Sequence, residues 1–570
     1  MTMNSKPIYH LAESTLVEPL VNSWSAWPFL IAPVPASLHL LRYQLPLLQS
    51  YIEDPATHAA ASQDPSFVGG AFVGISADRM SEVSALLNCT MNNLNHNLEL
   101  AKSLLEFQSW LVANAKGYSL APYYQRVPDP LRGYVELVYD YFNRPSLRFF
   151  ENLLYQSRYF NSSLQSLRLS RLDRDNSRPF FFNTPRLMEG GQIDWQIPFD
   201  AFQVDQLFML DTQPQSLDFI CEVLQLNERS RGRLLPMLTE EPRIPPKKWE
   251  RESVRIRYFG HACLLIERKG ISILTDPLIA AIPAKDGLER FSYGDLPGEI
   301  DFALITHNHP DHISLETILR LRHRIKCLVV PRSFGILYGD ISLKALAHRI
   351  GFRNIIEMDA LENLMFPDGE IIGVPFLGEH SDLAHGKTGY VIRLGKRRIL
   401  IGADSDCLDR QVYRNARQCI GRVDTVFLGT ESVGAPLSWS NGSLLAKKPS
   451  SEEEESRRQH GCDARRAINI LDALGANRLY NYAMGMEPWM EHILGLGITE
   501  NSPQWQESEK LLAQARTRGF LAAERLYGKA EIVLEDADIA EEAFVSITST
   551  AQSAGNREIS ADDEFVFDLD

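Results

Sequence analysis

The sequence predicts an α/β protein in two parts, a layered α/β domain preceded by a separate N-terminal α+β domain. From residue 254 onward, short apolar runs typical of strands alternate with amphipathic segments, and strand after strand ends in polar residues. Residues 1–240 instead alternate amphipathic helical stretches with loops. The paired prolines and charges of EEPRIPPKKWERES (240–253) are typical of a linker. We therefore expect domains at 1–240 and 254–535, joined by a linker at 241–253.

Composition and charge exclude several classes of protein. A net charge of −15 argues against a nucleic-acid or anionic-membrane surface. No apolar run reaches the roughly 18 residues of a membrane helix, and the start MTMNSKPIYHLAEST lacks the pattern of a signal peptide. The seven cysteines are scattered without a CxxC pair, which favours a reducing cytoplasm.

The N-terminal part shows no catalytic constellation. Apolar residues at helical spacing predict a helix over 81–112, and the aromatic-rich stretch 143–160 is interpreted in the same way. A region of this size needs a role, and we expect a surface for docking or for formation of a homodimer.

The second part opens with the pattern of a small sheet. VRIRYFGHACLLIERKGISILTDPLI predicts two strands joined by a turn at Lys269–Gly270. IDFALIT is an apolar strand, and SLETILRLRHRI is an amphipathic helix capped by Ser314. Further strands are expected in KCLVVP, IIGVPFLGEH, TGYVIRLG, RRILIGADS, VDTVFLGTES and NRLYNYA.

Two charged segments lie outside this pattern. PSSEEEESRR (449–458) is interpreted as a flexible, solvated insertion. Residues 535–570 hold eleven acids and one arginine, a net charge of −10 out of the −15 of the whole chain. Because this stretch has few apolar anchors, we expect an acidic, mostly disordered tail over 536–570.

The stretch LITHNHPDHI (304–313) carries the chemistry. In an extended backbone alternate side chains share a face, so His307 and His309 can reach one metal ion together. Asp311 and His312 follow in the turn and are placed to hold a second ion, while Pro310 stiffens the spacing. Imidazole suits zinc, iron, copper and nickel, and carboxylate widens the set toward iron and manganese. A chance grouping of polar loop residues is disfavoured by the spacing and the preceding strand.

This HxHxDH pattern after an apolar strand resembles the metallo-β-lactamase superfamily. GHAC (260–263), TDP (275–277) and GADS (402–405) support the resemblance, which covers about 254–535. It implies an αββα sandwich with two metals at one edge. In the hydrolases of that superfamily a further histidine completes the first site and an aspartate bridges both ions. The bridging residue maps to Asp404, with Asp406 and Asp409 as weaker candidates that cap the next helix or meet solvent.

The completing ligand falls in GEHSDL (378–383), which offers both Glu379 and His380. Neighbouring strand residues point to opposite faces, so only one of them can easily be a ligand. A glutamate would give a carboxylate-rich set that stabilises the oxidation states of O₂ chemistry, whereas a histidine would suit zinc and hydroxide attack. Spacing alone leaves the choice open.

A closer resemblance extends over nearly the whole length. The sequence is similar to the non-haem diiron β-hydroxylases of chloramphenicol biosynthesis. Six stretches carry the similarity: VEPLVNSWSAWPFL (17–30), YIEDPATHAAA (51–61), FLGEHSDL (376–383), the GADS turn, VDTVFLGTESVGA (423–435) and YAMGMEPWM (482–490).

The resemblance implies a site and a reaction. His307, His309 and Glu379 would hold one iron, Asp311 and His312 the other, and Asp404 would bridge them. Glu379 and Asp404 would be the catalytic ligands, O₂ the co-substrate and a ferredoxin-like protein the electron donor. The substrate would be an amino acid held as a thioester on a nonribosomal peptide synthetase carrier domain.

Four further residues are weaker candidates for a role at the metal site. Glu431 in GTES either hydrogen-bonds behind the cluster or caps a strand end, and His492 is a candidate late ligand. His261 is expected to support the metal loops, and His380 to pack behind the site if Glu379 is the ligand. The competing functions are a dinuclear zinc hydrolase acting on a lactone or phosphodiester, and a non-catalytic docking component of a synthetase.

Overall fold

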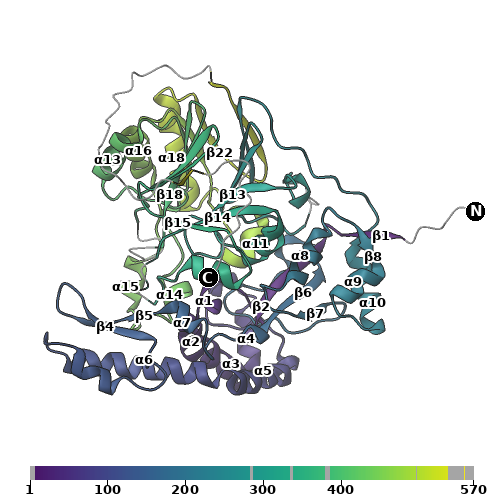
Figure 1. Ribbon diagram of the computed structural model, residues 1–570, viewed down its shortest axis with the longest axis vertical. Helices are drawn as coiled ribbons and strands as arrows, with labels where there is room; N and C mark the ends of the chain where they lie inside the picture. The colour runs from purple at the N-terminus through teal and green to yellow at the C-terminus, as the bar shows by residue number, and fades with distance from the viewer. Residues whose placement is uncertain are drawn as a thin grey trace, which may run out of the picture.

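The computed structural model describes residues 7–282, 287–333, 335, 338–378, 386–495, 497–536 and 557–558. Two packed sheets with helices on their outer faces form one half of the molecule, and the N-terminal residues form the other (Figure 1). Within the described part of the chain, no helix has the length and apolar character needed to cross a membrane.

The first sheet of the sandwich has the strand order β15-β14-β13-β12-β11-β10-β23. Its strands from β12 to β15 are parallel, and the others are antiparallel. The strands are β10 (Val254–Gly260), β11 (Cys263–Arg268), β12 (Ile271–Thr275), β13 (Ile300–Leu304), β14 (Ile325–Pro331), β15 (Ile355–Met358) and β23 (Ala530–Leu534).

The second sheet has the order β22-β21-β20-β19-β18-β17-β16-β24, with β19 to β22 parallel. The strands are β16 (Asn363–Phe366), β17 (Gly369–Val374), β18 (Gly389–Leu394), β19 (Arg397–Ile401), β20 (Thr425–Leu428), β21 (Arg478–Asn481), β22 (Ala522–Arg525) and β24 (Arg557–Glu558). Most of the tail expected at 536–570 lies outside the described residues, and β24 is the part of it that pairs with β16.

Apolar side chains from both sheets meet in one core. Ile256 and Phe302 of the first sheet and Ile392 and Phe427 of the second belong to the same buried cluster. Helices α13 (Arg410–Ile420), α16 (Ala464–Leu474) and α18 (Pro503–Thr517) cover the outer face of the second sheet (Figure 1). Helices α11 (Leu315–Leu321) and α12 (Leu343–Arg349) cover the first. The αββα sandwich predicted from the sequence is confirmed.

The N-terminal part combines sheets and helices, as predicted. Its largest sheet has the order β3-β2-β6-β7, from β2 (Thr15–Val21), β3 (Trp24–Ser25), β6 (Gln165–Arg171) and β7 (Ile193–Gln196). Its hydrophobic core continues without a break into α11 and α12 of the sandwich. The two parts therefore share buried surface, and residues 240–253, all described, connect them outside any helix or strand.

The helical stretch predicted at 81–112 is confirmed, and it consists of two helices, α5 (Met80–Asn93) and α6 (Asn95–Asn114). Two other local predictions were wrong. The stretch 143–160 begins with strand β5 (Pro145–Phe149), which pairs with β4 (Val135–Tyr139), and continues into the single-turn helix α7 (Glu151–Leu154). The segment 449–458 contains the short helix α15 (Ser451–Ser456), because Ser450 and Glu453 form a capping box at its start.

Candidate metal centre

The candidate site lies at the ends of strands from both sheets. β13 runs directly into the HxHxDH motif, and the predicted cap of the next helix is present, since Ser314 Oγ accepts a hydrogen bond from Thr317 N. Asp276 follows β12, His261 follows β10 and Asp404 follows β19. The carboxyl ends of parallel strands meet at one edge of a sheet, which brings side chains distant in sequence into one site.

The motif's side chains converge as the sequence predicts. The ring centroids of His307 and His309 are 4.6 Å apart, and those of His307 and His312 are 4.2 Å apart. His307 and His312 are fully buried, whereas His309 is 8% exposed. The residue least enclosed by protein is thus His309, at the rim of the cluster.

Asp404 lies between two of these histidines. Its Oδ2 is 2.9 Å from His312 Nε2 and 3.5 Å from His307 Nε2. The three side chains offer ligand atoms that all lie within 4.8 Å of one another. A carboxylate in this position can contact ions held on either side of it.

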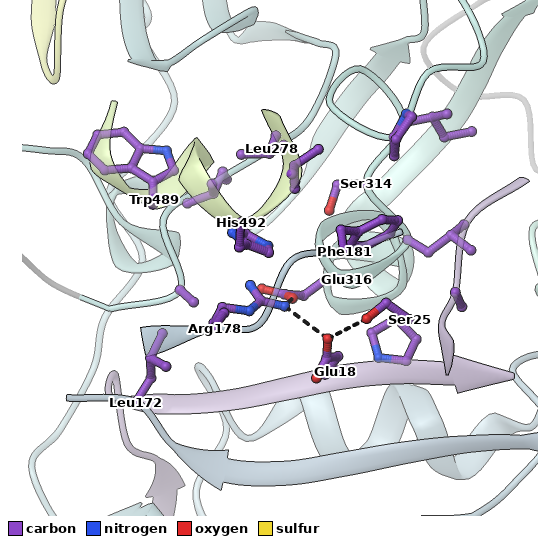
Figure 2. Close-up of a pocket in the computed structure, with 18 of the residues that line it drawn as sticks. Glu18, Ser25, Leu172, Arg178, Phe181, Leu278, Ser314, Glu316, Trp489 and His492 are labelled. Atoms are coloured by element: carbon purple, nitrogen blue, oxygen red, sulfur yellow. Dashed lines mark hydrogen bonds and ion pairs between the residues drawn. The ribbon is translucent and has the colours of Figure 1, made fainter. Parts of the chain in front are cut away.

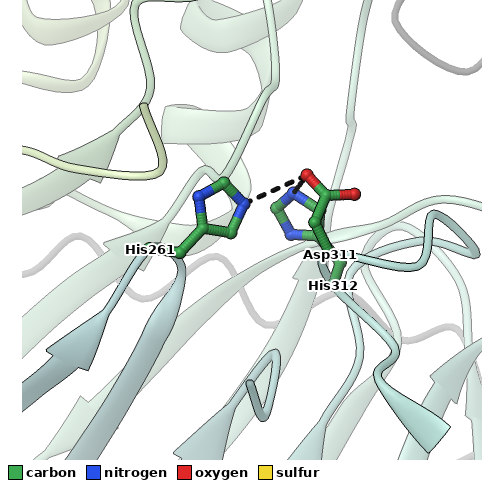
Figure 3. Close-up of side chains that lie close together, drawn as sticks. All are labelled: His261, Asp311 and His312. Carbon is green, nitrogen blue, oxygen red and sulfur yellow. Dashed lines mark hydrogen bonds and ion pairs between the residues drawn. The ribbon is translucent and has the colours of Figure 1, made fainter. Parts of the chain in front are cut away.

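A second group of metal-binding atoms adjoins the first. His261, Asp311 and His312 place one ligand atom each within 4.8 Å of one another (Figure 3). His261 Nε2 is 3.1 Å from Asp311 Oδ2, and His312 Nε2 is 3.6 Å from the same oxygen. His261 thus contacts a residue of the motif, and the support of the metal loops expected from it stays a prediction.

Asp276 lies at the candidate site, and sequence reasoning assigned it no role. Its carboxylate accepts hydrogen bonds from Thr306 N and Thr306 Oγ1, both at 2.7 Å, and its Oδ2 is 2.8 Å from His312 Nδ1. It therefore fixes the start of the metal loop and the orientation of one imidazole. The TDP triplet at the end of its strand was the available signal.

The backbone around the site is strained at four positions that are not glycine. His261, Asp276, Ala403 and Ala483 have φ values between 36° and 52°, in the left-handed region. Each of the four lies just after a strand that ends at the site: β10, β12, β19 or β21. Strain of this kind concentrates at functional sites, where the surrounding fold holds it in place.

The carboxylates create a strongly negative field at the cluster. Although burial opposes protonation of His312, the carboxylates of Asp404, Asp311 and Asp276 raise its pKa well above the usual value. Burial would also raise the pKa of Asp311, but the charges on His312 and His261 hold it well below its usual range. A field that attracts a proton onto a buried imidazole also attracts a metal cation.

Glu379 and His380, the alternative completing ligands, lie outside the described residues. Glu431 follows β20, is half-buried and accepts a hydrogen bond from Gly461 N through its backbone carbonyl. Neither group of clustered ligand atoms found among the described residues includes Glu431.

Three other candidates lie apart from these groups. His492 is buried in a cavity between the two halves of the molecule, against Glu18 and Arg178. Burial and the neighbouring arginines hold its pKa well below the usual value, so the imidazole is neutral. Asp406 pairs with Arg466 at 2.6 Å, and Asp409 caps α13 by accepting a hydrogen bond from Gln411 N.

The donor set matches a pair of iron ions. It combines imidazole nitrogens with carboxylate oxygens, the ligand types that suit iron, and offers two overlapping groups that share His312. Burial of the cluster and the hydrogen bonds that His312 donates to Asp276 and His307 donates to Thr306 hold the ligands in position.

Comparison with known proteins agrees with this description. Residues 10–242 match the family model described as the diiron non-heme beta-hydroxylase N-terminal domain, and residues 255–368 match that of the beta-lactamase superfamily domain. The chain is 34% identical to the 4-amino-L-phenylalanyl-[CmlP-peptidyl-carrier-protein] 3-hydroxylase of Streptomyces venezuelae, over 91% of this chain and 98% of the relative. The crystal structure of CmlA, a diiron beta-hydroxylase from the same species, superposes with a TM-score of 0.86 at 32% identity, over 93% of this chain and 100% of that one.

Fold and site together define an enzyme of the metallo-β-lactamase superfamily that holds two metal ions. More narrowly, the chain belongs to the family of diiron non-haem β-hydroxylases. Its cofactor is a pair of iron ions, and its reaction is an O₂-dependent monooxygenation.

Proposed function

We propose that this enzyme hydroxylates the β-carbon of an amino acid carried as a thioester on a nonribosomal peptide synthetase carrier domain, in the biosynthesis of an antibiotic-like natural product. The proposal is carried by the relative from Streptomyces venezuelae, whose name specifies a carrier-bound aminoacyl substrate and whose length is matched over 98%. The N-terminal family domain is matched as well as the metal-binding half.

The proposed ligand set is His307, His309 and Glu379 for one iron and Asp311 and His312 for the other, with Asp404 as the bridge. The position of Asp404 Oδ2 between His307 Nε2 and His312 Nε2 supports the bridging assignment. When bound, the iron pair supplies the reductive activation of O₂.

Three residues next to the proposed ligands hold those ligands in their orientations. Asp276 accepts a hydrogen bond from His312 Nδ1–H, which leaves the lone pair of Nε2 directed at the cluster. Thr306 Oγ1 lies 3.0 Å from His307 Nδ1 and fixes that ring in the same way. His261 holds the carboxylate of Asp311.

Glu379 is the proposed control element. With iron bound, Glu379 would be the ligand that makes O₂ reactivity depend on the presence of carrier-bound substrate. The variant Glu379→His should react with O₂ without dependence on substrate. If stopped-flow measurements show unchanged O₂ reactivity and unchanged substrate dependence, this role is wrong.

The reaction requires external electrons. One oxygen atom enters the C–H bond and the other leaves as water, which consumes two electrons and two protons. A ferredoxin-like protein is the proposed donor. The cytoplasm, whose reducing conditions suit iron(II) delivery, is the proposed compartment, and all seven cysteines are free thiols in the structure.

We propose that the enzyme forms a homodimer through its N-terminal half. Tyr118, Tyr141 and Phe142 lie around the end of α6 and the β4–β5 turn, and all are largely exposed. Large exposed aromatic side chains are enriched at interfaces. Light scattering should show a dimer, and Tyr141→Ser with Phe142→Ser should shift it toward monomer; an unshifted dimer would exclude this surface.

The function is tested with candidate carrier domains loaded with different amino acids. With iron, reductant and O₂, intact-protein mass spectrometry should show a gain of one oxygen atom on one of them. Metal analysis should find iron rather than zinc, and the oxidised enzyme should show the visible band of an oxo-bridged diferric site. Bound zinc with ester hydrolysis and no oxygen gain would instead support the dinuclear hydrolase.

A further inference from the structure

A large cavity opens in the N-terminal half, away from the metal ligands. It has a volume of about 740 Å³, within the range of about 300–1,000 Å³ that ligand sites occupy. Six arginines and two glutamates line it, with no lysine or aspartate. On a chain with a net charge of −15, this is a concentration of positive charge that favours an anionic ligand.

Most of these arginines already have protein partners. Arg168 forms two hydrogen bonds with Asp194 at 2.6 and 2.7 Å, and Arg186 pairs with Glu18 at 3.0 Å. Arg171, at the end of β6, and Arg233, in helix α10 (Glu228–Leu234), differ: both are exposed, and neither pairs with an acid in the described part of the chain. These two guanidinium groups have donors to offer a ligand.

The wall near these two arginines is open. Gly190, Gly191 and Gly232 line the same cavity, and a Cβ atom added at any of them would meet nothing within 4 Å. The space is therefore not filled by packing. Ser170, Ser177 and Gln192 add neutral hydrogen-bonding groups to the lining.

A second, smaller cavity, with a volume of about 30 Å³, adjoins this one. The two share Glu18, Leu172 and Arg178, and Figure 2 shows Arg178 and Ser25 on either side of the Glu18 carboxylate. The lining of the smaller cavity also includes Pro310 and Ile313, the residues on either side of Asp311 and His312.

The smaller cavity contains polar groups that lack partners. His492 Nδ1 and Trp489 Nε1 are buried and make no hydrogen bond to any described residue. Burial without a hydrogen bond costs free energy, so groups of this kind indicate a bound water or ligand.

We propose that the arginine-lined cavity binds the phosphodiester of the phosphopantetheine arm on which a carrier domain holds its aminoacyl thioester, with Arg171 and Arg233 as the phosphate contacts. This inference rests on the proposed function, which requires such an arm. The arm would extend from the phosphate along the shared wall of Glu18 and Arg178 toward the metal motif.

The test measures binding of small probes to the iron-loaded full chain by calorimetry. 4′-Phosphopantetheine should bind about tenfold or more tightly than pantetheine, which lacks the phosphate. The double variant Arg171→Glu, Arg233→Glu should abolish that preference, whereas Arg414→Glu, an exposed charge reversal on α13, should retain it. Iron content and circular dichroism check that each variant is folded.

A matched pair at Gly232 tests the location without removing an arginine. Gly232→Ala should bind 4′-phosphopantetheine as the wild type does, because its Cβ enters open space. Gly232→Glu should lose binding, because it adds a negative charge to the same space. Equal binding by both variants would overturn the proposal.

Other results would also overturn it. These are equal affinity for pantetheine and 4′-phosphopantetheine, an unchanged preference in the double arginine variant, or inorganic phosphate binding as tightly as the arm. If the wild-type enzyme hydroxylates a loaded carrier domain and the double arginine variant binds that carrier domain normally, the proposed phosphate site is refuted. The proposed function is then unaffected. Phosphate-dependent binding without hydroxylation of any carrier would refute the function instead.

Discussion

His312 and Asp276 form a buried hydrogen-bonded pair, with 2.8 Å between Nδ1 and Oδ2, on the side of the imidazole opposite to Asp404. The pair joins the ends of β12 and β13, because Asp276 also accepts hydrogen bonds from Thr306. One carboxylate thus sets both the path of the metal loop and the tautomer of a proposed ligand.

Replacing Asp276 with Asn should weaken metal binding about 10–100-fold, because an amide cannot accept the proton of His312 Nδ1–H and fix Thr306 N at the same time. Iron affinity can be measured by competition with a chelator. Asp409→Asn is the control, since asparagine also caps a helix. Unchanged iron affinity in Asp276→Asn would contradict the orienting role.

Replacing Asp404 with Asn should reduce the iron content from two ions per chain to one or none. The amide oxygen carries no charge and cannot bridge two cations as a carboxylate does. Metal analysis and the visible spectrum of the oxidised enzyme measure the effect. Two tightly bound irons with an unaltered spectrum would show that Asp404 is not the bridge.

The contact between the two halves should contribute strongly to stability. Arg320 of α11 donates two hydrogen bonds to Asp211 of the N-terminal part, at 2.8 and 2.7 Å, and both residues are buried. Asp211→Ala leaves a buried guanidinium without this partner and should destabilise the fold by about 3–5 kcal/mol. Denaturant unfolding measures the loss, and the additional change Arg320→Met should recover part of it. A wild-type unfolding curve for Asp211→Ala would exclude a stabilising role.

Glu151 should make stability depend on pH. Burial raises its pKa to about 7, although it accepts a hydrogen bond from Ser342 N at 2.8 Å. Because the folded-state pKa lies above the unfolded value of about 4.5, the folded chain binds more protons between these pH values. Stability from this group therefore falls as pH rises through that window, and the loss is complete above about 7.

The variant Glu151→Gln removes this titration. Its Tm should exceed that of the wild type more at pH 8 than at pH 5, as measured by calorimetry. Glu106→Gln, on the exposed side of α6, serves as the control. An equal Tm difference at both pH values would show that Glu151 does not titrate in this range.

The apolar pattern of a short segment does not predict its structure where the same pattern fits both a helix and a strand. In 143–160 the apolar spacing fits a helix, yet Leu147 and Phe149 are buried and Arg148 is exposed, the alternation of a strand. Pairing of β5 with β4, whose partner residues lie 6 to 14 positions earlier in the chain, decides the outcome. The helical stretch predicted at 81–112 is interrupted at Leu94, where the backbone leaves the helical conformation.

The sequence by itself determined the helix cap at Ser314 and the presence of a metal motif, because each depends on residues close together in the chain, and its resemblance to the metallo-β-lactamase superfamily determined the αββα class. The placement of Asp276 and His261 against that motif, and of Asp404 between His307 and His312, required the tertiary structure. These contacts join residues 30 to 97 positions apart, at the ends of strands that belong to both sheets. The arginine-lined cavity likewise joins β6, α10 and the loop at Gly190, and no spacing along the chain encodes that proximity.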